Sequence, residues 1–278
     1  MLLSLKPGLR PFIVGRSTFA GIGRKTAHWL GDNYATWAYM KRSIQGVLQF
    51  NLFAIPMVGP DTCGFNANTD EELCNRWMQL SAFFPFYRNH NTKGALAQEP
   101  YRWDSVAAAS ITAINARYSL LPYWETLFAE ASQTGAPPVR ALFHEFDDPS
   151  LYDNDAQFMI GSSILVTPQL QPNQSTVTGN FPTEDGVTWT NFFTHEKLDT
   201  SAGDTVSVAA PLGSIPVHVR SGSIILMHAD VEYTLTDTRN GSYGLLVTLD
   251  GKGYAEGVAK IDDGNSFPGA LSPPRTSK

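Results

Sequence analysis

The periodicity of the sequence changes near residue 140, and this change restricts the folds that the chain can adopt. Before residue 140, short apolar runs alternate with longer segments whose apolar residues recur every three or four positions. That alternation is typical of βα units on a parallel sheet. After residue 140 the helical period disappears, and short β-branched runs are separated by Gly, Pro, Asn and Asp. This second pattern favours an antiparallel β-sandwich, so we expect α/β followed by all-β.

The first part is expected to contain four strands and three helices. We predict strands at residues 12–14, 28–30, 54–59 and 83–87, and helices at 34–51, from about 70, and at 105–131. Asp32 or Asn33 would cap the first helix. Thr69, with Glu72 three residues later, fits a capping box for the second. Pro122 should bend the third.

The second part is expected to be entirely β. We predict strands at residues 163–166, 205–208, 216–220 and 245–249. We divide the chain into the second half of a parallel barrel (1–140), a β-sandwich (141–228) and the truncated start of a further β domain (229–278). The turn-rich segment 268–275 is predicted to be disordered.

Composition excludes several classes of protein. The chain has 278 residues, of which 42% are hydrophobic and 17% charged, so it can bury a sizeable core. A net charge of −6 without a long basic run argues against a nucleic-acid partner. No apolar stretch approaches the roughly 20 residues of a membrane span. Residues 1–7 are too short for a signal peptide, and the early core strand suggests a piece of a longer chain.

Polar side chains follow successive strands of the expected α/β part. The residues at these positions are Arg16, Asp32, Asp61 and His90. Parallel α/β sheets and barrels gather their sites at the carboxyl ends of the strands. We therefore expect these four side chains to meet at one edge.

Asp32 is the strongest candidate for catalysis. His28 and Trp29 precede it, and burial beside them would raise the pKa of its carboxyl group, as a general acid requires. The alternative is a helix N-cap. Trp29 offers an aromatic face on which a pyranose ring could stack, although Trp is also an ordinary core residue.

Arg16 and His90 also have two interpretations each. The Arg16 guanidinium could clamp a hydroxyl group, or it could form a structural ion pair. His90 could donate a hydrogen bond to a substrate, or it could pack in the core.

Other catalytic motifs are missing or fail on spacing. Residues 21–26, GIGRKT, contain glycines and a Lys-Thr pair, but the spacing differs from that of a phosphate-binding loop. No His and carboxylate cluster has zinc spacing, and no G-x-S-x-G elbow is present. We therefore expect no metal and no cofactor.

Cys63 and Cys74 are the only cysteines of the chain. They could form a disulfide that closes a short loop, or remain buried free thiols. The sequons at Asn173 and Asn240 predict glycosylation and favour secretion.

Several motifs occur together along nearly the whole chain. They are GRSTFAG (15–21), HWLGDN (28–33), GPDTCGF (59–65), EELCNRW (71–77), YRNHN (87–91), QEPY (98–101), RYSLLPY (117–123), FHEF (143–146) and IPVHVR (215–220). In this combination the chain resembles glycoside hydrolase family 31, the retaining α-glucosidases.

The resemblance implies a fold, an activity and a set of residues. The family folds as a (β/α)8 barrel followed by β-sandwiches, so this chain would be the second half of the barrel and a sandwich. Asp32 would be the general acid/base in the hydrolysis of terminal α-linked glucose from α-glucoside oligosaccharides. The implied sugar-binding residues are Arg16, Trp29, Asp61, Phe65 and His90. Cys63 and Cys74 would form a disulfide.

One family feature has no match in this chain. The family's nucleophile is an aspartate in a tryptophan-rich motif on an earlier barrel strand, and that motif does not occur here. Retaining hydrolysis needs two carboxyl groups about 5–5.5 Å apart. We expect a complementary N-terminal chain to carry the nucleophile. The alternative is a chain that is inactive alone, as a sugar-binding remnant or one subunit of a two-chain enzyme.

Overall fold

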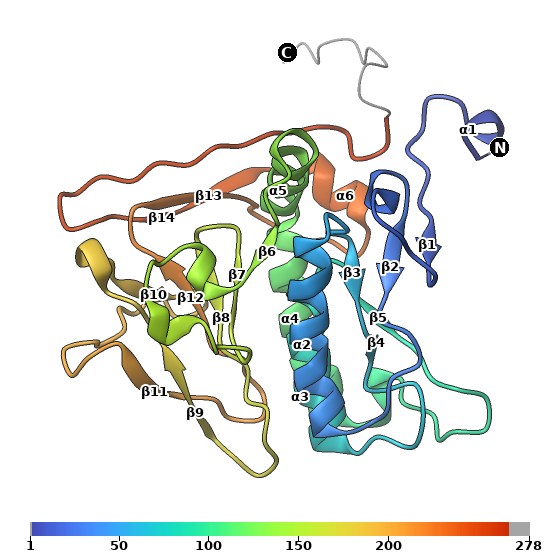
Figure 1. Cartoon of the computed structure of the whole chain (residues 1–278), viewed down its shortest axis with the longest axis horizontal. Coiled ribbons are helices and arrows are strands. Elements are labelled where there is room, and N and C mark those ends of the chain that lie inside the picture. Colours follow the sequence, from blue (N-terminus) through green and yellow to red (C-terminus); the bar gives the residue numbers. More distant parts are fainter. Residues whose placement is uncertain (1, 267–278) are drawn as a thin grey trace.

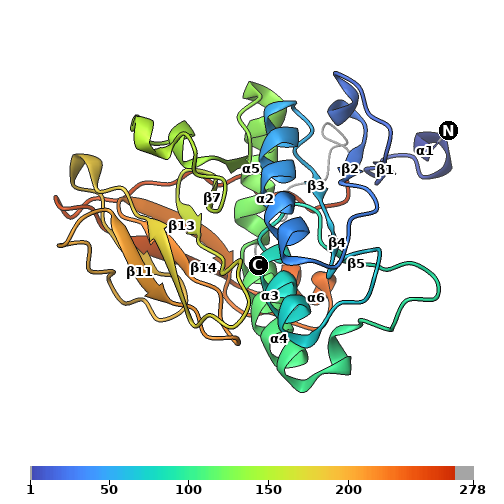
Figure 2. The ribbon, with the colours of Figure 1, turned by 60° about the horizontal axis from the view of Figure 1, so that its bottom comes forward.

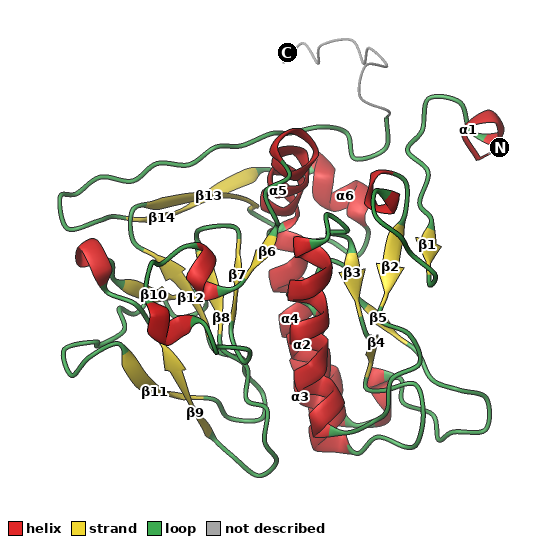
Figure 3. Cartoon of the chain, in the orientation of Figure 1, coloured by secondary structure: helices red, strands yellow, loops and turns green. Residues whose placement is uncertain are grey.

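The computed structural model describes residues 2–266, and these form three layers. Short parallel strands form the first layer and an antiparallel β domain forms the third (Figure 1). Long helices stand between them, and the same order is visible after the rotation in Figure 2. Figure 3 shows how the helices separate the two groups of strands. The expected α/β part followed by an all-β part is confirmed.

The parallel strands form two short sheets. β1 (Val14–Gly15), β2 (Ala27–Trp29) and β3 (Val58–Gly59) pair in that order, and β4 (Asp61–Thr62) pairs with β5 (Arg88–Asn89). Only Pro60 separates β3 from β4. The two sheets therefore make one run of parallel neighbours that does not close into a barrel within residues 2–266.

The helical layer consists of four helices. They are α2 (Trp37–Leu52), α3 (Glu71–Ser81), α4 (Asp104–Ser119) and α5 (Leu121–Thr134). Pro122 lies in the first turn of α5, so the expected bend is a break between two helices. The remaining helices are short: α1 (Leu2–Leu5), η1 (Ile22–Arg24), η2 (Pro100–Arg102), η3 (Leu142–His144), η4 (Pro149–Leu151), η5 (Glu184–Gly186) and α6 (Leu235–Asn240).

The β domain contains a five-stranded antiparallel sheet with the order β10-β12-β8-β7-β6. Its strands are β6 (Val139–Arg140), β7 (Phe158–Ile160), β8 (Ile164–Val166), β10 (Trp189–Asn191) and β12 (Val217–Arg220). Two antiparallel pairs accompany it: β9 (Thr176–Asn180) with β11 (Thr205–Ala209), and β13 (Ser223–His228) with β14 (Tyr243–Thr248). Because β6 pairs with β7, this sheet extends back across residue 140.

Two apolar clusters hold the layers together. The larger one joins the helices to the five-stranded sheet, with Trp77 and Phe84 packed in the same cluster as Phe158 and Val217. The smaller one lies between that sheet and the β9–β11 pair, and Trp189 is fully buried in it. The sheet is therefore covered by helices on one side and by strands on the other.

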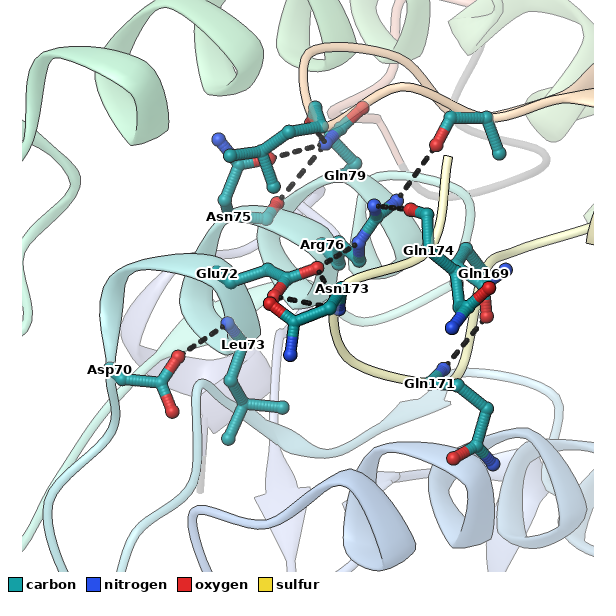
Figure 4. A network of polar contacts seen from close by, with 12 residues as sticks. Asp70, Glu72, Leu73, Asn75, Arg76, Gln79, Gln169, Gln171, Asn173 and Gln174 are labelled. Atoms are coloured by element: carbon teal, nitrogen blue, oxygen red, sulfur yellow. Dashed lines mark hydrogen bonds and ion pairs between the residues drawn. The ribbon is translucent and has the colours of Figure 1, made fainter. Parts of the chain in front are cut away.

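A polar cluster around Arg76 of α3 also joins the helical layer to the β domain (Figure 4). Arg76 is buried on α3, and its Nε lies 3.1 Å from Glu72 Oε1. Its Nη1 donates to the carbonyl of Ala210 at 3.2 Å, and its Nη2 donates to the carbonyl of Gln174. Glu72 in turn accepts a hydrogen bond from the backbone N–H of Asn173 at 3.0 Å. One buried cation thus binds two loops of the β domain to a helix.

Residues 249–266, which we name the strap, run back from β14 across the molecule (Figure 1). The strap contacts α5 where the backbone N–H of Lys260 donates to Oγ1 of Thr126, at 2.9 Å. At the far end, Asp262 forms an ion pair with Arg10, and the Arg10 N–H donates to the carbonyl of Asn265 at 2.8 Å. The strap therefore connects the N-terminal segment to the end of the described chain.

Two helix caps were predicted at the wrong residues. Thr36 caps α2, because its side chain accepts a hydrogen bond from the Tyr39 N–H at 3.3 Å, so neither Asp32 nor Asn33 does. The cap of α3 is not Thr69 but its neighbour: Asp70 accepts from the backbone N–H of the third residue of the helix at 2.9 Å. In both cases a side chain closer to the first turn takes the position.

Two predicted strands of the first part were also misplaced. Residues 83–85 are buried but not extended, since the N–H groups of Phe83 and Phe84 bond back to the end of α3, and the strand follows at β5. The strand expected at 54–59 is reduced to β3, and Ala54 has a positive φ of 58°. The disorder predicted for 268–275 lies outside the described residues.

Candidate active site

The carboxyl ends of the parallel strands meet at one edge, and the polar residues that follow them lie together there. Arg16 follows β1, Asp32 follows β2, Asp61 begins β4 and His90 follows β5. The charges of Asp32 and His90 both act on the Asp61 carboxyl group. The four polar residues that the sequence predicted to meet at one edge therefore come from four different strands and the turns after them.

Asp32 lies on an exposed turn between β2 and α2. Its backbone carbonyl accepts a hydrogen bond from Asn66 Nδ2 at 3.1 Å, while no hydrogen bond within residues 2–266 engages its carboxylate. Gly31, with φ of 81°, allows the turn, and a Cβ at that position would lie 4.0 Å from Arg16 Nε. The carboxylate therefore has no partner among the described residues, and Arg16 lines the same cavity.

Asp61 has the opposite environment. Its side chain is fully buried, and Oδ1 forms an ion pair with Arg88. The other oxygen, Oδ2, is buried without a hydrogen-bond partner among the described residues. Burial raises the pKa of Asp61; Arg88 and His90 oppose this rise, and the charge of Asp32 adds to it. One oxygen is thus held by Arg88 and the other remains an unused acceptor.

Aromatic rings surround this pair. The Arg88 guanidinium lies over the Trp29 ring, 5.6 Å from its centroid. The rings of Phe65 and His90 lie 5.2 Å apart at a tilt of 40°. Side chains from β2, β4 and β5 and the loops that follow them therefore form one aromatic and charged wall.

The loop that carries Phe65 is anchored on two sides. Cys63 and Cys74 form a disulfide that ties the loop to α3, as the family resemblance implied. The buried amide of Gln98 donates to the carbonyl of Gly64 at 3.1 Å and also to the carbonyl of His90 at 3.3 Å. The loop after β4 and the loop after β5 are thus held to each other.

A cavity of about 500 Å³ opens beside Asp32. Arg16 and Trp29 line it from the strand side, and Tyr39, Arg42 and Gln49 line it from α2. His28 also lines this cavity, and its buried ring stacks on Phe50 of α2, with ring centroids 4.0 Å apart. Burial lowers the pKa of His28.

Three polar residues of this site were not predicted as site residues. Asn33 and Gln98 are buried carboxamides that connect the loops, and Arg88 pairs with Asp61. Each lies within a motif already noted (HWLGDN, YRNHN or QEPY), so the available signal was membership of these motifs. Among residues 2–266, no three His, Cys, Asp or Glu side chains are grouped to hold a metal ion. No described helix is long and apolar enough to cross a membrane.

Known proteins share both parts of this architecture. The model of the glycosyl hydrolases family 31 TIM-barrel domain matches residues 2–127, and that of the family 31 C-terminal domain matches residues 135–225. An α-glucosidase of Aspergillus oryzae is 51% identical over 267 residues, which is 95% of this chain and 27% of that protein. Glucoamylase 1 of Candida albicans is 50% identical, over 95% of this chain and 28% of its own length.

Solved structures agree in fold. The glucosidase II α subunit in a Glc1Man2-bound crystal structure matches with a TM-score of 0.91 and 34% identity, over 96% of this chain and 29% of that one. A second crystal structure shows ER glucosidase II as a heterodimeric complex of a catalytic subunit and the binding domain of a regulatory subunit. This chain spans little more than a quarter of the length of the curated relatives it matches. With both family models matched in order along it, the chain belongs to glycoside hydrolase family 31.

Proposed function

We propose that this chain supplies the acid/base half of a retaining hydrolase of α-glucosides. The observation that supports this most directly is the contrast between two neighbouring carboxyl groups. Asp32 is exposed with a free carboxylate, whereas Asp61 is buried and paired with Arg88. A group that gives and takes a proton must reach the substrate, and only Asp32 is accessible in this way.

The surrounding residues are proposed to bind the sugar. Arg16 and His90 would donate hydrogen bonds to its hydroxyl groups, and the buried Asp61 would support the site by holding Arg88. The rings of Trp29 and Phe65 would contact the apolar face of the pyranose. The substrate would be an α-glucoside oligosaccharide with glucose at its non-reducing end.

The reaction would proceed in two steps. In the first, the proton of Asp32 moves to the glycosidic oxygen as the bond from C1 to that oxygen breaks and a carboxylate forms a bond to C1. In the second, Asp32 takes a proton from water, which attacks C1 and releases the carboxylate. Asp61 does not suit the nucleophile's role, because Arg88 holds it. We propose that the nucleophile lies in the part of the family's length that this chain does not span, or on a complementary chain.

The experiment inserts this chain in place of the matching 267-residue segment of the Aspergillus oryzae α-glucosidase. We name this protein the grafted enzyme. We expect it to hydrolyse an aryl α-glucoside, and we expect Asp32→Asn to reduce its turnover by about 10²–10⁴-fold. Asp153→Asn removes a similarly exposed carboxylate far along the chain and should leave turnover unchanged. An Asp32→Asn enzyme with undiminished turnover would refute the assignment.

A second candidate is sugar binding without catalysis by the chain alone. It is favoured by the pairing of Asp61 with Arg88, which leaves Asp32 without a partner nucleophile among the described residues. The purified chain distinguishes the two, since binding of maltose without hydrolysis of an aryl α-glucoside supports this candidate. Clear turnover by the isolated chain would exclude it.

We further propose a protein of the secretory pathway with glycans on Asn173 and Asn240. Both side chains are exposed. The disulfide between Cys63 and Cys74 is typical of proteins that mature in an oxidising compartment.

A further inference from the structure

Asn33 directly follows the proposed acid/base and connects two loops of the site. Its side chain is buried, with 7% of its surface exposed. Nδ2 donates to the carbonyl of Asp61 at 2.9 Å, and Oδ1 accepts from the N–H of Phe65 at 2.9 Å. Its backbone carbonyl accepts from the N–H of Asn66 at 2.8 Å. Asn33 thus makes three of the hydrogen bonds that join the turn after β2 to the segment 61–66, beside those of Asn66 with Asp32 and Ala35.

A carboxamide suits this position for a chemical reason. Asn33 meets one carbonyl and one N–H on the neighbouring segment, so its side chain must both donate and accept. An ionised Asp could only accept, and an apolar side chain would leave both backbone groups unpaired. Space is also restricted, because a Cβ at Gly64 would come within 2.3 Å of the Ala35 backbone. Any side chain at Gly64 would force these segments apart.

We propose that Asn33 is the positioning residue that holds Asp32 at the correct place for proton transfer. Asp32 itself is attached to the site only through its backbone, by the bond from Asn66 to its carbonyl. The Asn33 side chain adds two hydrogen bonds, to the Asp61 carbonyl and the Phe65 N–H, that hold the turn carrying Asp32. Loss of Asn33 would let the carboxyl group move relative to the wall formed by Asp61 and Phe65. This inference rests on the proposed function.

The test separates proton donation from the rest of the reaction by changing the leaving group. Glucose leaves maltose as a strongly basic oxygen and needs the proton of Asp32, whereas fluoride leaves α-glucosyl fluoride as a weak base and needs little help. In the grafted enzyme, Asn33→Ala should lower kcat/KM for maltose by about tenfold or more and kcat/KM for α-glucosyl fluoride by less than about threefold, because kcat/KM reports only the step in which the leaving group departs. Asn33→Asp, which keeps the shape and loses the donor, should show the same selectivity.

Asn51 provides a matched control. It is 2% exposed, its Nδ2 donates to the carbonyl of Val47 at 2.9 Å, and its Oδ1 accepts from the N–H of Val139 at 3.1 Å. Asn51 is thus also a buried carboxamide that donates to one backbone carbonyl and accepts from one backbone N–H. It lies in α2 and connects this helix to β6. Asn51→Ala should lower the melting temperature but leave the ratio of the two rates unchanged.

Each outcome bears on the inference. Equal losses on both substrates, or no loss, would overturn it, and failure of both Asn33 variants to fold would show a purely structural role. A grafted enzyme that is inactive on both substrates before any substitution would instead refute the proposed function, and the inference with it. Selective loss on maltose in the Asn33 variants alone would support it.

Discussion

Thr36, and not Asp32, provides the N-cap of α2. Its side chain takes the cap position of α2 and satisfies the N–H of Tyr39. A free carboxylate one turn earlier is therefore not needed by the helix. The interpretation of Asp32 as a helix cap is wrong for this reason, and its charge is available to a ligand.

At the same scale, Arg88 is expected to control the stability of the site through Asp61. Burial raises the pKa of Asp61 above its ordinary value, and Arg88 opposes that rise. A carboxyl group whose pKa is raised by folding contributes stability below its unfolded pKa, and this is lost as the pH increases through the folded pKa. In Arg88→Met the folded pKa moves higher still. We expect a loss of about 2 kcal/mol at neutral pH that becomes small near pH 4.

Urea unfolding at several pH values measures this difference. Arg102→Met is the matched control, because Arg102 also lies over an indole, with its guanidinium 5.8 Å from the centroid of the Trp103 ring. That variant should show no comparable dependence on pH. A loss in Arg88→Met that is the same at pH 4 and pH 7 would contradict this account of Asp61.

At the scale of single elements, the sequence predicted helices better than strands. The apolar face of residues 34–51 has the helical period, and α2 spans Trp37–Leu52. The strands of the first layer are only two or three residues long, and so short a run shows no recognisable alternation of apolar and polar residues. Phe83 and Phe84 were assigned to a strand because they are apolar, yet they fill the core from a turn. An apolar run indicates burial and does not by itself indicate an extended backbone.

The joint between α3 and the β domain provides a prediction for one element. Arg76→Met removes the cation that binds Glu72 and the carbonyls of Ala210 and Gln174, and it leaves the buried Ala210 carbonyl without this donor. We expect the free energy of unfolding to fall by about 3 kcal/mol. Because this residue connects two layers, calorimetry should also show the single thermal transition separating into two.

Arg117→Met is the control for this experiment. Arg117 is also deeply shielded, but it donates to the carbonyls of Ala82 and Pro85 within the helical layer. Its loss should lower stability without separating the transitions. If the Arg76 variant retained a single transition, the layers would be coupled mainly by the apolar cluster.

At the scale of the whole molecule, the parallel strands β1–β5 and the β domain lie on opposite sides of the helices (Figure 1). The change of periodicity near residue 140 predicted an α/β part followed by an all-β part, but not this placement around the helices. The sequence did not indicate which residues from distant segments would meet, such as Asn33 with Phe65 or Arg76 with Ala210. Those contacts depend on how the layers pack, for which a single sequence has no local signal. Most of the site was therefore found as separate motifs, and its connecting carboxamides were missed.

The strap has a consequence for the order in which the molecule assembles and opens. The ion pair of Arg10 with Asp262 joins residues that are 252 positions apart. Bringing such distant segments together costs loop entropy, and few hydrogen bonds compensate for it. The strap should therefore dock last and open first, as a local unfolding event.

Hydrogen exchange followed by mass spectrometry measures this order. Peptides that contain Arg10 and Lys260 should exchange well before those of β8 (Ile164–Val166), although all these regions have bonded amides. Equal protection would mean that the strap opens only with the core. If it opens first, a protease that cuts within residues 249–266 would also release the segment around Arg10. Cleavage of the strap would then loosen the strand β1 that follows this segment.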